Sequence, residues 1–377
     1  MGRTDPPGLL TPITIKGRTL RNRIVMPPMA SHLSPPDGSV TQEHLDRYVP
    51  RAAAGVGLAM VEHCYVVAGG RTSDDQLGIH DDALIAGHAR LCERIRATGA
   101  VTGVQLNHGG GKVPSACSGH QPVSASAGVV PRGQEECRAA TVAEIEEYPR
   151  GFAQAARRGV RAGYDLVETH GAHGYLLSQF LSPLVNRRDD GYGGDAERRL
   201  ALPCAVVRAV RAAVGPDYWV QYRLGALDYK PGGLDAAAAV AAARVLIEAG
   251  VDSIHISGGV HGPQAQDWDG TSEGYHVDIA AYVRAAVTVP VIVPGAIRTP
   301  AFADRVVRDG KADLVAVGTA MLDNPRWAAD AIEALAGSSQ SRIVPNHSGL
   351  APGVDPMKLN RLNDQLEAED FAGTRGG

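Results

Sequence analysis

Eight short apolar runs recur along the chain, and each is followed by a segment with a helical pattern. The runs are nearly continuous in apolar character, which is typical of strands buried on both faces of a parallel sheet. They occupy residues 21–29, 55–63, 101–108, 164–170, 218–225, 252–258, 289–295 and 312–318.

The segments between these runs have the spacing of amphipathic helices. They predict helices near residues 41–54, 81–98, 149–162, 195–213, 235–249, 276–287 and 300–309. Eight βα units in one chain predict an α/β fold, the (β/α)8 TIM barrel. A doubly wound sheet is the alternative, and the lack of a Gly-x-Gly-x-x-Gly after the first run counts against it.

A hairpin is predicted before the first barrel strand. Residues 9–22 contain two short β-type runs that turn at Lys16 and Gly17. We expect this hairpin to plug the floor of the barrel, within a domain that spans residues 1–336.

Two further segments break the alternation of strands and helices. Residues 109–140 form a long loop rich in Gly, Ser and Pro, and loops of this length are usually functional. Thr141 and Glu144 then form a capping-box pattern that predicts the start of a short helix. Residues 337–377 are expected to be a C-terminal extension with a helix near 356–368, too short for a cofactor domain.

The composition excludes several classes of partner. A formal net charge of −4 over 377 residues leaves no basic face for nucleic acid. The longest apolar stretches are Ala-rich amphipathic helices rather than membrane spans, and residues 1–17 lack the apolar core of a signal peptide. The five cysteines form no Cys-x-x-Cys pair, so neither a disulfide framework nor a zinc or iron–sulfur site is indicated. We therefore expect a soluble, cytoplasmic protein.

Polar side chains gather where the predicted strands end. In barrels of this kind the chemistry lies at the carboxyl ends of the strands. The polar positions there are Met29 to His32, Glu62, His63, Gln105, His108, His170, His173, Tyr175 and Arg223.

His170 and His173 have three competing interpretations. With Glu168 or His108 as a third ligand they could bind zinc, although the fixed third ligand and base of strong zinc motifs are missing. As neutral imidazoles they could instead hold one carbonyl oxygen, with Tyr175 as a proton donor beside them. Ordinary core filling is the third possibility, and the residues alone leave all three open.

The predicted position of Arg223 requires a partner that can accept its hydrogen bonds. Arg223 lies on a predicted strand, and an arginine that points into a barrel must face an anion or a strong acceptor, because an unpaired buried charge is costly. The stretch "NHGGGKV" invites comparison with a phosphate loop, but it lacks the first glycine and the Ser or Thr after Lys112.

Several stretches together resemble the Old Yellow Enzyme family of FMN-dependent NAD(P)H oxidoreductases. These are "NRIVMPPM", "VQLNHGG", "AGYDLVETHGAHGYLLSQFLSPLVNRRDDGYGGDAERR" and "ADLVAVG", and the similarity runs in order from about residue 9 to 335. The resemblance implies a (β/α)8 barrel with FMN at its carboxyl-terminal mouth, a small-molecule substrate, and NADH or NADPH as electron donor.

The resemblance also assigns roles to residues. His170 and His173 match the pair that grips the substrate oxygen, and Tyr175 matches the proton donor. Gln105 would bond the pyrimidine edge of the flavin, and Arg223 would lie against its N1 and O2. The flavin would further be lined by Pro28, Met29 and Ala30, by His63 near its O4, and by Gly258, Gly259, Gly295, Ala296, Gly318 and Thr319 along the ribityl chain and phosphate.

The chain departs from the family pattern at several positions. Gly111 and Thr319 stand where relatives commonly have arginine, so the phosphate would rely on backbone amides, the Thr319 hydroxyl and Arg298. His32 lies near where some members place a second tyrosine, and would contact substrate.

Three functions follow from this resemblance. The favoured one is an ene-reductase that reduces an α,β-unsaturated carbonyl compound. A flavin dehydrogenase or demethylase, with His32 and His63 as candidate bases, is the second. A flavin-free binding or non-redox barrel is the third, and the sequence leaves open whether the chain forms a homo-oligomer.

Overall fold

Eight parallel strands close into a barrel in the computed structural model, which describes residues 6–265 and 268–336. The strands follow one another around the barrel in chain order, so the predicted (β/α)8 architecture is confirmed. They are β3 (Ile24–Met26), β4 (Leu58–Tyr65), β5 (Val101–Asn107), β8 (Leu166–Gly171), β9 (Trp219–Leu227), β10 (Ser253–Gly258), β11 (Val291–Val293) and β12 (Leu314–Ala316).

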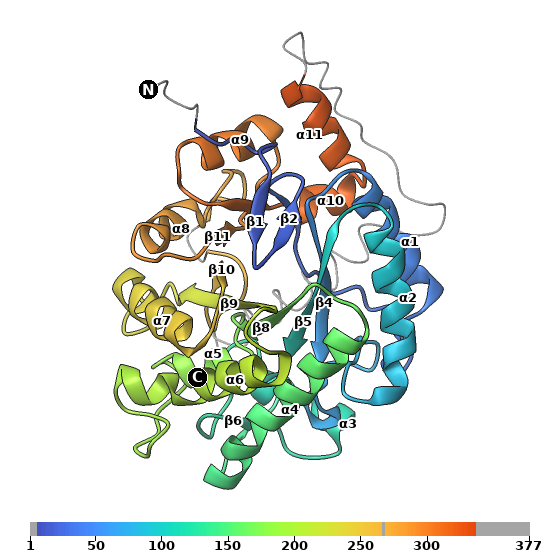
Figure 1. Ribbon diagram of the computed structural model, residues 1–377. Coiled ribbons are helices and arrows are strands. Elements are labelled where there is room, and N and C mark those ends of the chain that lie inside the picture. Colours follow the sequence, from blue (N-terminus) through green and yellow to red (C-terminus); the bar gives the residue numbers. More distant parts are fainter. Residues whose placement is uncertain (1–5, 266–267, 337–377) are drawn as a thin grey trace. The chain divides into compact units, whose positions relative to one another are not determined.

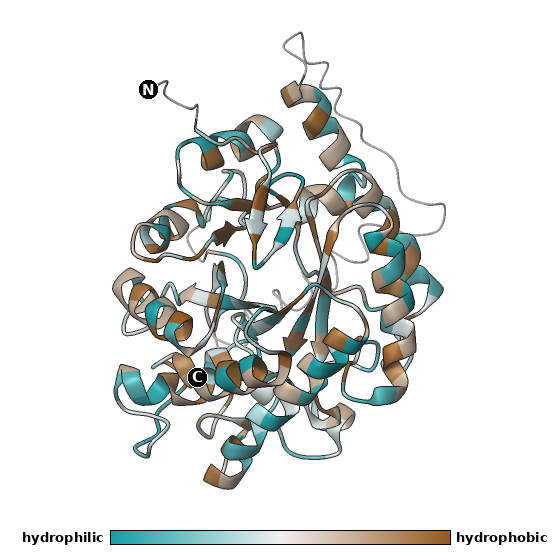
Figure 2. Cartoon of the chain, viewed as in Figure 1, coloured by the Kyte–Doolittle hydropathy of each residue, from teal (hydrophilic) through white to brown (hydrophobic). Residues whose placement is uncertain are grey.

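Helices surround the barrel (Figure 1). The seven predicted ones are α1 (Gln42–Ala53), α2 (Ile85–Arg96), α4 (Val142–Arg161), α6 (Ala196–Val214), α7 (Ala236–Ala249), α8 (Val277–Arg284) and α9 (Pro300–Arg308). Four more were not predicted: α3 (Ser115–Ser118), α5 (Leu176–Leu181), α10 (Thr319–Asp323) and α11 (Trp327–Ala336). The surrounding helices carry both hydrophilic and hydrophobic residues (Figure 2), as amphipathic helices on a barrel should.

The prediction for α4 was wrong in one respect. The Thr141–Glu144 capping box is present, but it starts a single helix of 20 residues rather than a short one followed by another at 149–162. Pro149 lies inside this helix, although it removes one backbone hydrogen bond. Ile145 and Phe152, on either side of Pro149, are fully buried. Their packing against the barrel therefore stabilises the helix despite the proline.

The predicted hairpin is present and fills the barrel floor. Strand β1 (Ile13–Ile15) pairs antiparallel with β2 (Arg18–Leu20). Lys16 and Gly17 between them have φ of 46° and 72°, the left-handed backbone of the tightest hairpin turns. The Ile15 and Leu20 side chains belong to one buried cluster with residues at the first positions of barrel strands, including Leu58, Leu166, Trp219 and Leu314.

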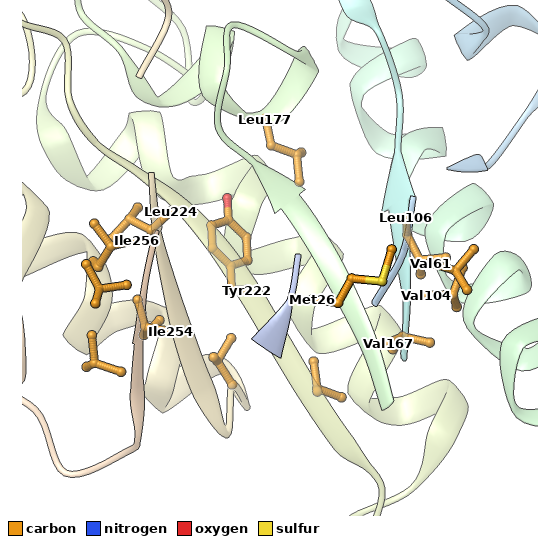
Figure 3. Close-up of a cluster of buried hydrophobic side chains, with 14 of the residues drawn as sticks. Met26, Val61, Val104, Leu106, Val167, Leu177, Tyr222, Leu224, Ile254 and Ile256 are labelled. Carbon is orange, nitrogen blue, oxygen red and sulfur yellow. The ribbon is translucent and has the colours of Figure 1, made fainter. Parts of the chain in front are cut away.

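Alternate residues of the barrel strands point outward, toward the helices. The outward set includes Val61, Val104, Leu106, Val167, Tyr222, Leu224, Ile254 and Ile256, which lie in one buried apolar cluster with Leu177 of α5 (Figure 3). Because side chains alternate along a strand, the residues between them face the barrel interior. Above the floor these are buried polar residues, namely Gln105, Glu168, His170, Gln221, Arg223, Ser253, His255 and Ser257. The strands are therefore not continuously apolar as expected, since their inner face becomes polar toward the mouth.

The long loop after β5 is partly ordered by short elements. It carries the four-residue helix α3 and two short parallel strands, β6 (Val123–Ser124) and β7 (Arg138–Ala139). The expected extension, 337–377, and its predicted helix lie outside the described residues. Within the described part of the chain, we find no helix with the length and apolarity needed to span a bilayer.

Candidate active site

The two histidines and the tyrosine come together at the carboxyl-terminal mouth. His170 is the fifth residue of β8, and His173 and Tyr175 lie in the turn that follows it. The His170 ring centroid lies 4.8 Å from that of His173 and 4.9 Å from that of Tyr175. His170 pairs in register with Arg223 on the neighbouring strand β9. The predicted clustering at one rim is thus present in the structure.

The backbone of this turn is held in an unusual conformation. His173 has φ of 58° and Gly174 has φ of 70°, and left-handed backbone is uncommon for a residue other than glycine. A Cβ on Gly174 would collide with the Val260 carbonyl oxygen. The amide of His173 also donates to the Gly258 carbonyl at 3.2 Å. The turn is therefore over-determined by its neighbours, and strain of this kind concentrates at functional sites.

Both histidines are neutral. Burial, assisted by the positive charge of Arg223, holds the pKa of His170 and of His173 well below the ordinary value. The His170 Nδ1 accepts the Ala172 amide at 3.2 Å, so the ring proton is on Nε2. The His173 Nε2 lies 2.6 Å from Ser257 Oγ, which also accepts a hydrogen bond from Arg223. The Ser257 hydroxyl can thus donate to Nε2 and leave His173 with its proton on Nδ1. Each ring keeps one N–H.

Tyr175 is protonated and surrounded by positive charge. Burial raises the pKa of its hydroxyl to about 12, against the influence of Arg132 and Arg223. The Lys112 ammonium lies 4.9 Å from the centre of the Tyr175 ring. The Tyr175 hydroxyl lies 3.0 Å from His63 Nε2. A neutral phenol in this setting is a proton source whose conjugate base would have cations near it.

Arg223 lacks an acceptor for most of its guanidinium group. Its side chain is buried, yet among the described residues it makes one hydrogen bond, from Nη2 to Ser257 Oγ at 3.2 Å, and its Nε has no partner there. A buried guanidinium left with free donors is costly. The residues present therefore fit a group with acceptor atoms beside Arg223, and the anion or strong acceptor expected there from the sequence stays a prediction.

Glu168 lies deeper in the barrel than His170, and its carboxylate accepts hydrogen bonds from three other side chains. It accepts from Gln105 Nε2 at 2.6 Å, from Gln221 Nε2 at 2.5 Å and from His255 Nδ1 at 2.7 Å. Burial raises its pKa, but His255 and the other partners outweigh burial and keep the carboxylate charged. This network fixes the orientation of the Gln105 amide, whose oxygen no other described residue engages.

The zinc interpretation loses both of its proposed third ligands. Glu168 is bonded within the barrel interior, and the His108 Nδ1 accepts the Gly110 amide while its ring packs on Tyr148. Among residues 6–265 and 268–336, no three His, Cys, Asp or Glu side chains are grouped to hold a metal ion.

The loop after β3 is anchored beside the end of β12. Glu62 accepts the Ser31 amide at 2.8 Å, and Arg47 donates to the Met29 and Ala30 carbonyls at 3.4 and 3.3 Å. The Met29 side chain lies next to Gly318, where a Cβ would still have room. This places Met29 against Gly318, and that Pro28, Met29 and Ala30 form one wall of the flavin site stays a prediction.

The other glycines of the predicted site have reasons within the protein. A Cβ on Gly258 would meet the Gly262 carbonyl, and one on Gly259 would meet Asp228 Oδ1. Gly295 has φ of 126°, and Ala296, which follows it, has φ of 50°. Close backbone packing at these two strand ends therefore explains the small residues, whatever they contact beyond the protein.

Two departures from the family pattern have physical explanations. Gly111 is buried, and a Cβ there would lie 2.7 Å from Cys137 Sγ and 2.8 Å from Val130, so an arginine does not fit. His32 is half-exposed, has φ of 55° and bonds Asp75 at 2.9 Å through Nδ1. No described contact joins the His32 ring to His170, His173 or Tyr175, so its role in substrate binding stays a prediction.

Several residues of the site were missed from sequence. Ser257 bridges His173 and Arg223, and Gln76 bonds His63 from the loop after β4. Lys112 donates to the His173 carbonyl at 3.3 Å. The signal for Ser257 was available, since it continues the period-two row of polar residues on β10 that begins at Ser253.

The comparisons with known proteins decide the family. A model of the NADH:flavin oxidoreductase / NADH oxidase family matches residues 8–336. The chain belongs to this family. It is 39% identical to an NADH oxidase of Thermoanaerobacter brockii over 328 residues, 86% of this chain but 50% of that protein. It is also 39% identical to an NADPH dehydrogenase of Bacillus licheniformis over 320 residues, 85% of this chain and 92% of that protein.

Solved structures agree with this assignment. Morphinone reductase superposes with a TM-score of 0.77 at 28% identity, over 88% of this chain and 90% of that one. The old yellow enzyme homologue of Zymomonas mobilis gives 0.73 at 25% identity, over 85% and 90%. The chain is an FMN-dependent NAD(P)H oxidoreductase of the Old Yellow Enzyme family, which confirms the resemblance read from its sequence.

The purified protein is expected to be yellow and to release FMN rather than FAD on heat denaturation, because its family is FMN-dependent. The visible spectrum of the native protein and chromatography of the released flavin check this. Protein that stays colourless after incubation with FMN would instead support the flavin-free barrel.

Proposed function

We propose that this oxidoreductase reduces the activated C=C bond of an α,β-unsaturated carbonyl compound with NADH or NADPH as electron donor. The observation that supports this most is the arrangement at the mouth, where two neutral imidazoles and a protonated phenol converge within ring-centroid distances of 4.8 to 6.5 Å. That set matches a substrate which must gain negative charge on oxygen and a proton on carbon.

His170 and His173 hold the substrate carbonyl oxygen. The N–H groups left free by Ala172 and Ser257 would both donate to it and stabilise the enolate charge that develops there. The low pKa values of His170 and His173 keep both rings neutral, so no further positive charge is buried beside Arg223. Tyr175 then delivers its hydroxyl proton to the α-carbon.

Arg223 and Gln105 hold the electron-rich edge of the cofactor. When bound there, FMN would supply the chemistry of hydride transfer between NAD(P)H and the substrate β-carbon. The free donors of Arg223 would meet negative charge at flavin N1 and O2, and the Gln105 amide, oriented by Glu168, would bond the pyrimidine edge. Pro28, Met29 and Ala30 would supply the wall of the site described above.

The far end of the cofactor would lie over the ends of β10, β11 and β12. Gly258, Gly259, Gly295, Ala296, Gly318 and Thr319 would accommodate the ribityl chain and phosphate through backbone amides and the Thr319 hydroxyl. Arg298 is a weaker candidate than its sequence position suggested, because its guanidinium already donates to the Thr271 carbonyl.

Replacing Arg223 with methionine is expected to lower the flavin midpoint potential, because the reduced flavin loses its counter-ion. The potential is measured by anaerobic dye-coupled titration of the holoenzyme. Arg94→Met, at an exposed position on α2, is the matched control and should leave the potential unchanged, since solvent screens its charge. An unchanged or raised potential in Arg223→Met would remove Arg223 from the flavin site.

The direction of the reaction can be tested without knowing the physiological substrate. Anaerobic mixing with NADPH or NADH alone should bleach the flavin, and an enone such as 2-cyclohexenone should then restore its colour. Bleaching by an organic donor such as an amine, and not by either nicotinamide, would support the dehydrogenase or demethylase instead.

A further inference from the structure

His63 lies at the mouth of the barrel with both ring nitrogens engaged by side chains. Its Nε2 is 3.0 Å from the Tyr175 hydroxyl, and its Nδ1 is 3.3 Å from Gln76 Nε2. Both ring nitrogens therefore have partners within the protein, and the expected position of His63 near flavin O4 stays a prediction. His63 faces the tyrosine.

The orientation of Gln76 determines which nitrogen of His63 carries the proton. The Gln76 Oε1 accepts from both the amide and the hydroxyl of Thr72, at 2.7 and 2.9 Å. Its Nε2 therefore points to His63, where it donates to the backbone carbonyl at 3.1 Å and faces Nδ1. An amide nitrogen can only donate, so Nδ1 must be the acceptor.

A neutral ring with an unprotonated Nδ1 carries its proton on Nε2. Burial lowers the pKa of His63 to about 4, so the ring is neutral near pH 7. Nε2–H is then the donor in the bond to Tyr175, and the tyrosine oxygen is the acceptor. Tyr175 therefore does not donate its hydroxyl proton to His63, and this proton remains available to the substrate.

We propose that His63, oriented by Gln76, is a positioning residue for proton delivery by Tyr175. This rests on the proposed function. When the O–H bond of Tyr175 breaks and a C–H bond forms at the substrate α-carbon, the electron pair and negative charge stay on the tyrosine oxygen. The His63 N–H already points at that oxygen and strengthens its bond as the charge develops. The positive charges of Lys112, Arg132 and Arg223 also favour negative charge on the tyrosine oxygen.

The tautomer can be measured independently of catalysis. In holoenzyme labelled with ¹⁵N-histidine, long-range ¹H–¹⁵N correlation separates protonated from unprotonated ring nitrogens. The His63 signals are assigned by their loss in His63→Phe. We expect a protonated Nε2 and an unprotonated Nδ1. The opposite tautomer would overturn the proposal, because Tyr175 would then donate its proton to His63, even if enone reduction were normal.

The kinetic test compares two variants at the same position. His63→Phe keeps a flat ring without a donor and should slow enone reduction by about 10–100-fold, as expected for losing a hydrogen bond to a charged oxygen. His63→Gln keeps an amide N–H and should recover part of that loss. The flavin content and visible spectrum of each purified variant show whether it is folded. Equal losses in the two variants would contradict the proposal.

Gln76 should act only through His63. Gln76→Met is expected to slow enone reduction when His63 is present and to have no further effect in the His63→Phe background. Additive losses would mean that Gln76 acts independently, as a structural residue would. If the wild-type enzyme reduces no enone at all, the proposed function fails, while the tautomer measurement still tests the arrangement of His63.

Discussion

Tyr175→Phe should slow enone reduction by about 10²–10⁴-fold, the range typical of a lost general acid. The ring and its packing remain, and only the hydroxyl with its bond to His63 is removed. Flavin reduction by NAD(P)H should proceed at the wild-type rate, because that half-reaction takes no proton from Tyr175. Stopped-flow measurement of the two half-reactions separates these outcomes.

The control for this variant is an exposed tyrosine. Tyr282 is 54% exposed on α8, and Tyr282→Phe should leave both half-reactions unchanged. If Tyr175→Phe reduces enones at the wild-type rate, the proton comes from another group. His63 would be the first alternative donor, because its Nε2 carries a proton in the assigned tautomer and faces the site.

Replacing His170 or His173 with alanine should damage substrate binding and enone reduction together. Each change removes one N–H donor to the substrate oxygen, and the loss of one such donor typically costs about 10²–10³-fold in rate. Apparent affinity should also fall, since the donors bind the ground-state carbonyl as well. Stopped-flow oxidation of the reduced enzyme over a range of enone concentrations gives both quantities.

The two histidine variants should differ in a second property. His173 bonds Ser257, which in turn accepts from Arg223, so His173→Ala also disturbs the Arg223 environment. We expect His173→Ala to shift the flavin potential more than His170→Ala does. His120→Ala, at an exposed loop position, is the control for both. Wild-type enone kinetics in either histidine variant would contradict the proposal that His170 and His173 hold the substrate oxygen.

The sequence determined the fold and most of the residues of the site. Largely apolar runs separated by amphipathic helices predict a parallel barrel, since strands in such a fold are buried on both faces. The alternation of strands and helices placed His170, His173, Tyr175 and Arg223 at one rim. The helix at Val142–Arg161 was misjudged because the local cost of Pro149 gave no information on the packing that overrides it.

Only the tertiary structure decided which of these side chains form hydrogen bonds with one another. Gln105, Glu168, Gln221 and His255 come from four different strands, and their hydrogen bonds depend on the register of those strands. Gln76 is 13 residues from His63 along the chain, and Tyr175 is 112 residues away. The protonation state of a ring depends on which partners surround it and how those partners are themselves bonded. Sequence spacing carries no such information, so the hydrogen-bond partners and protonation states of these side chains could be assigned only from the folded barrel.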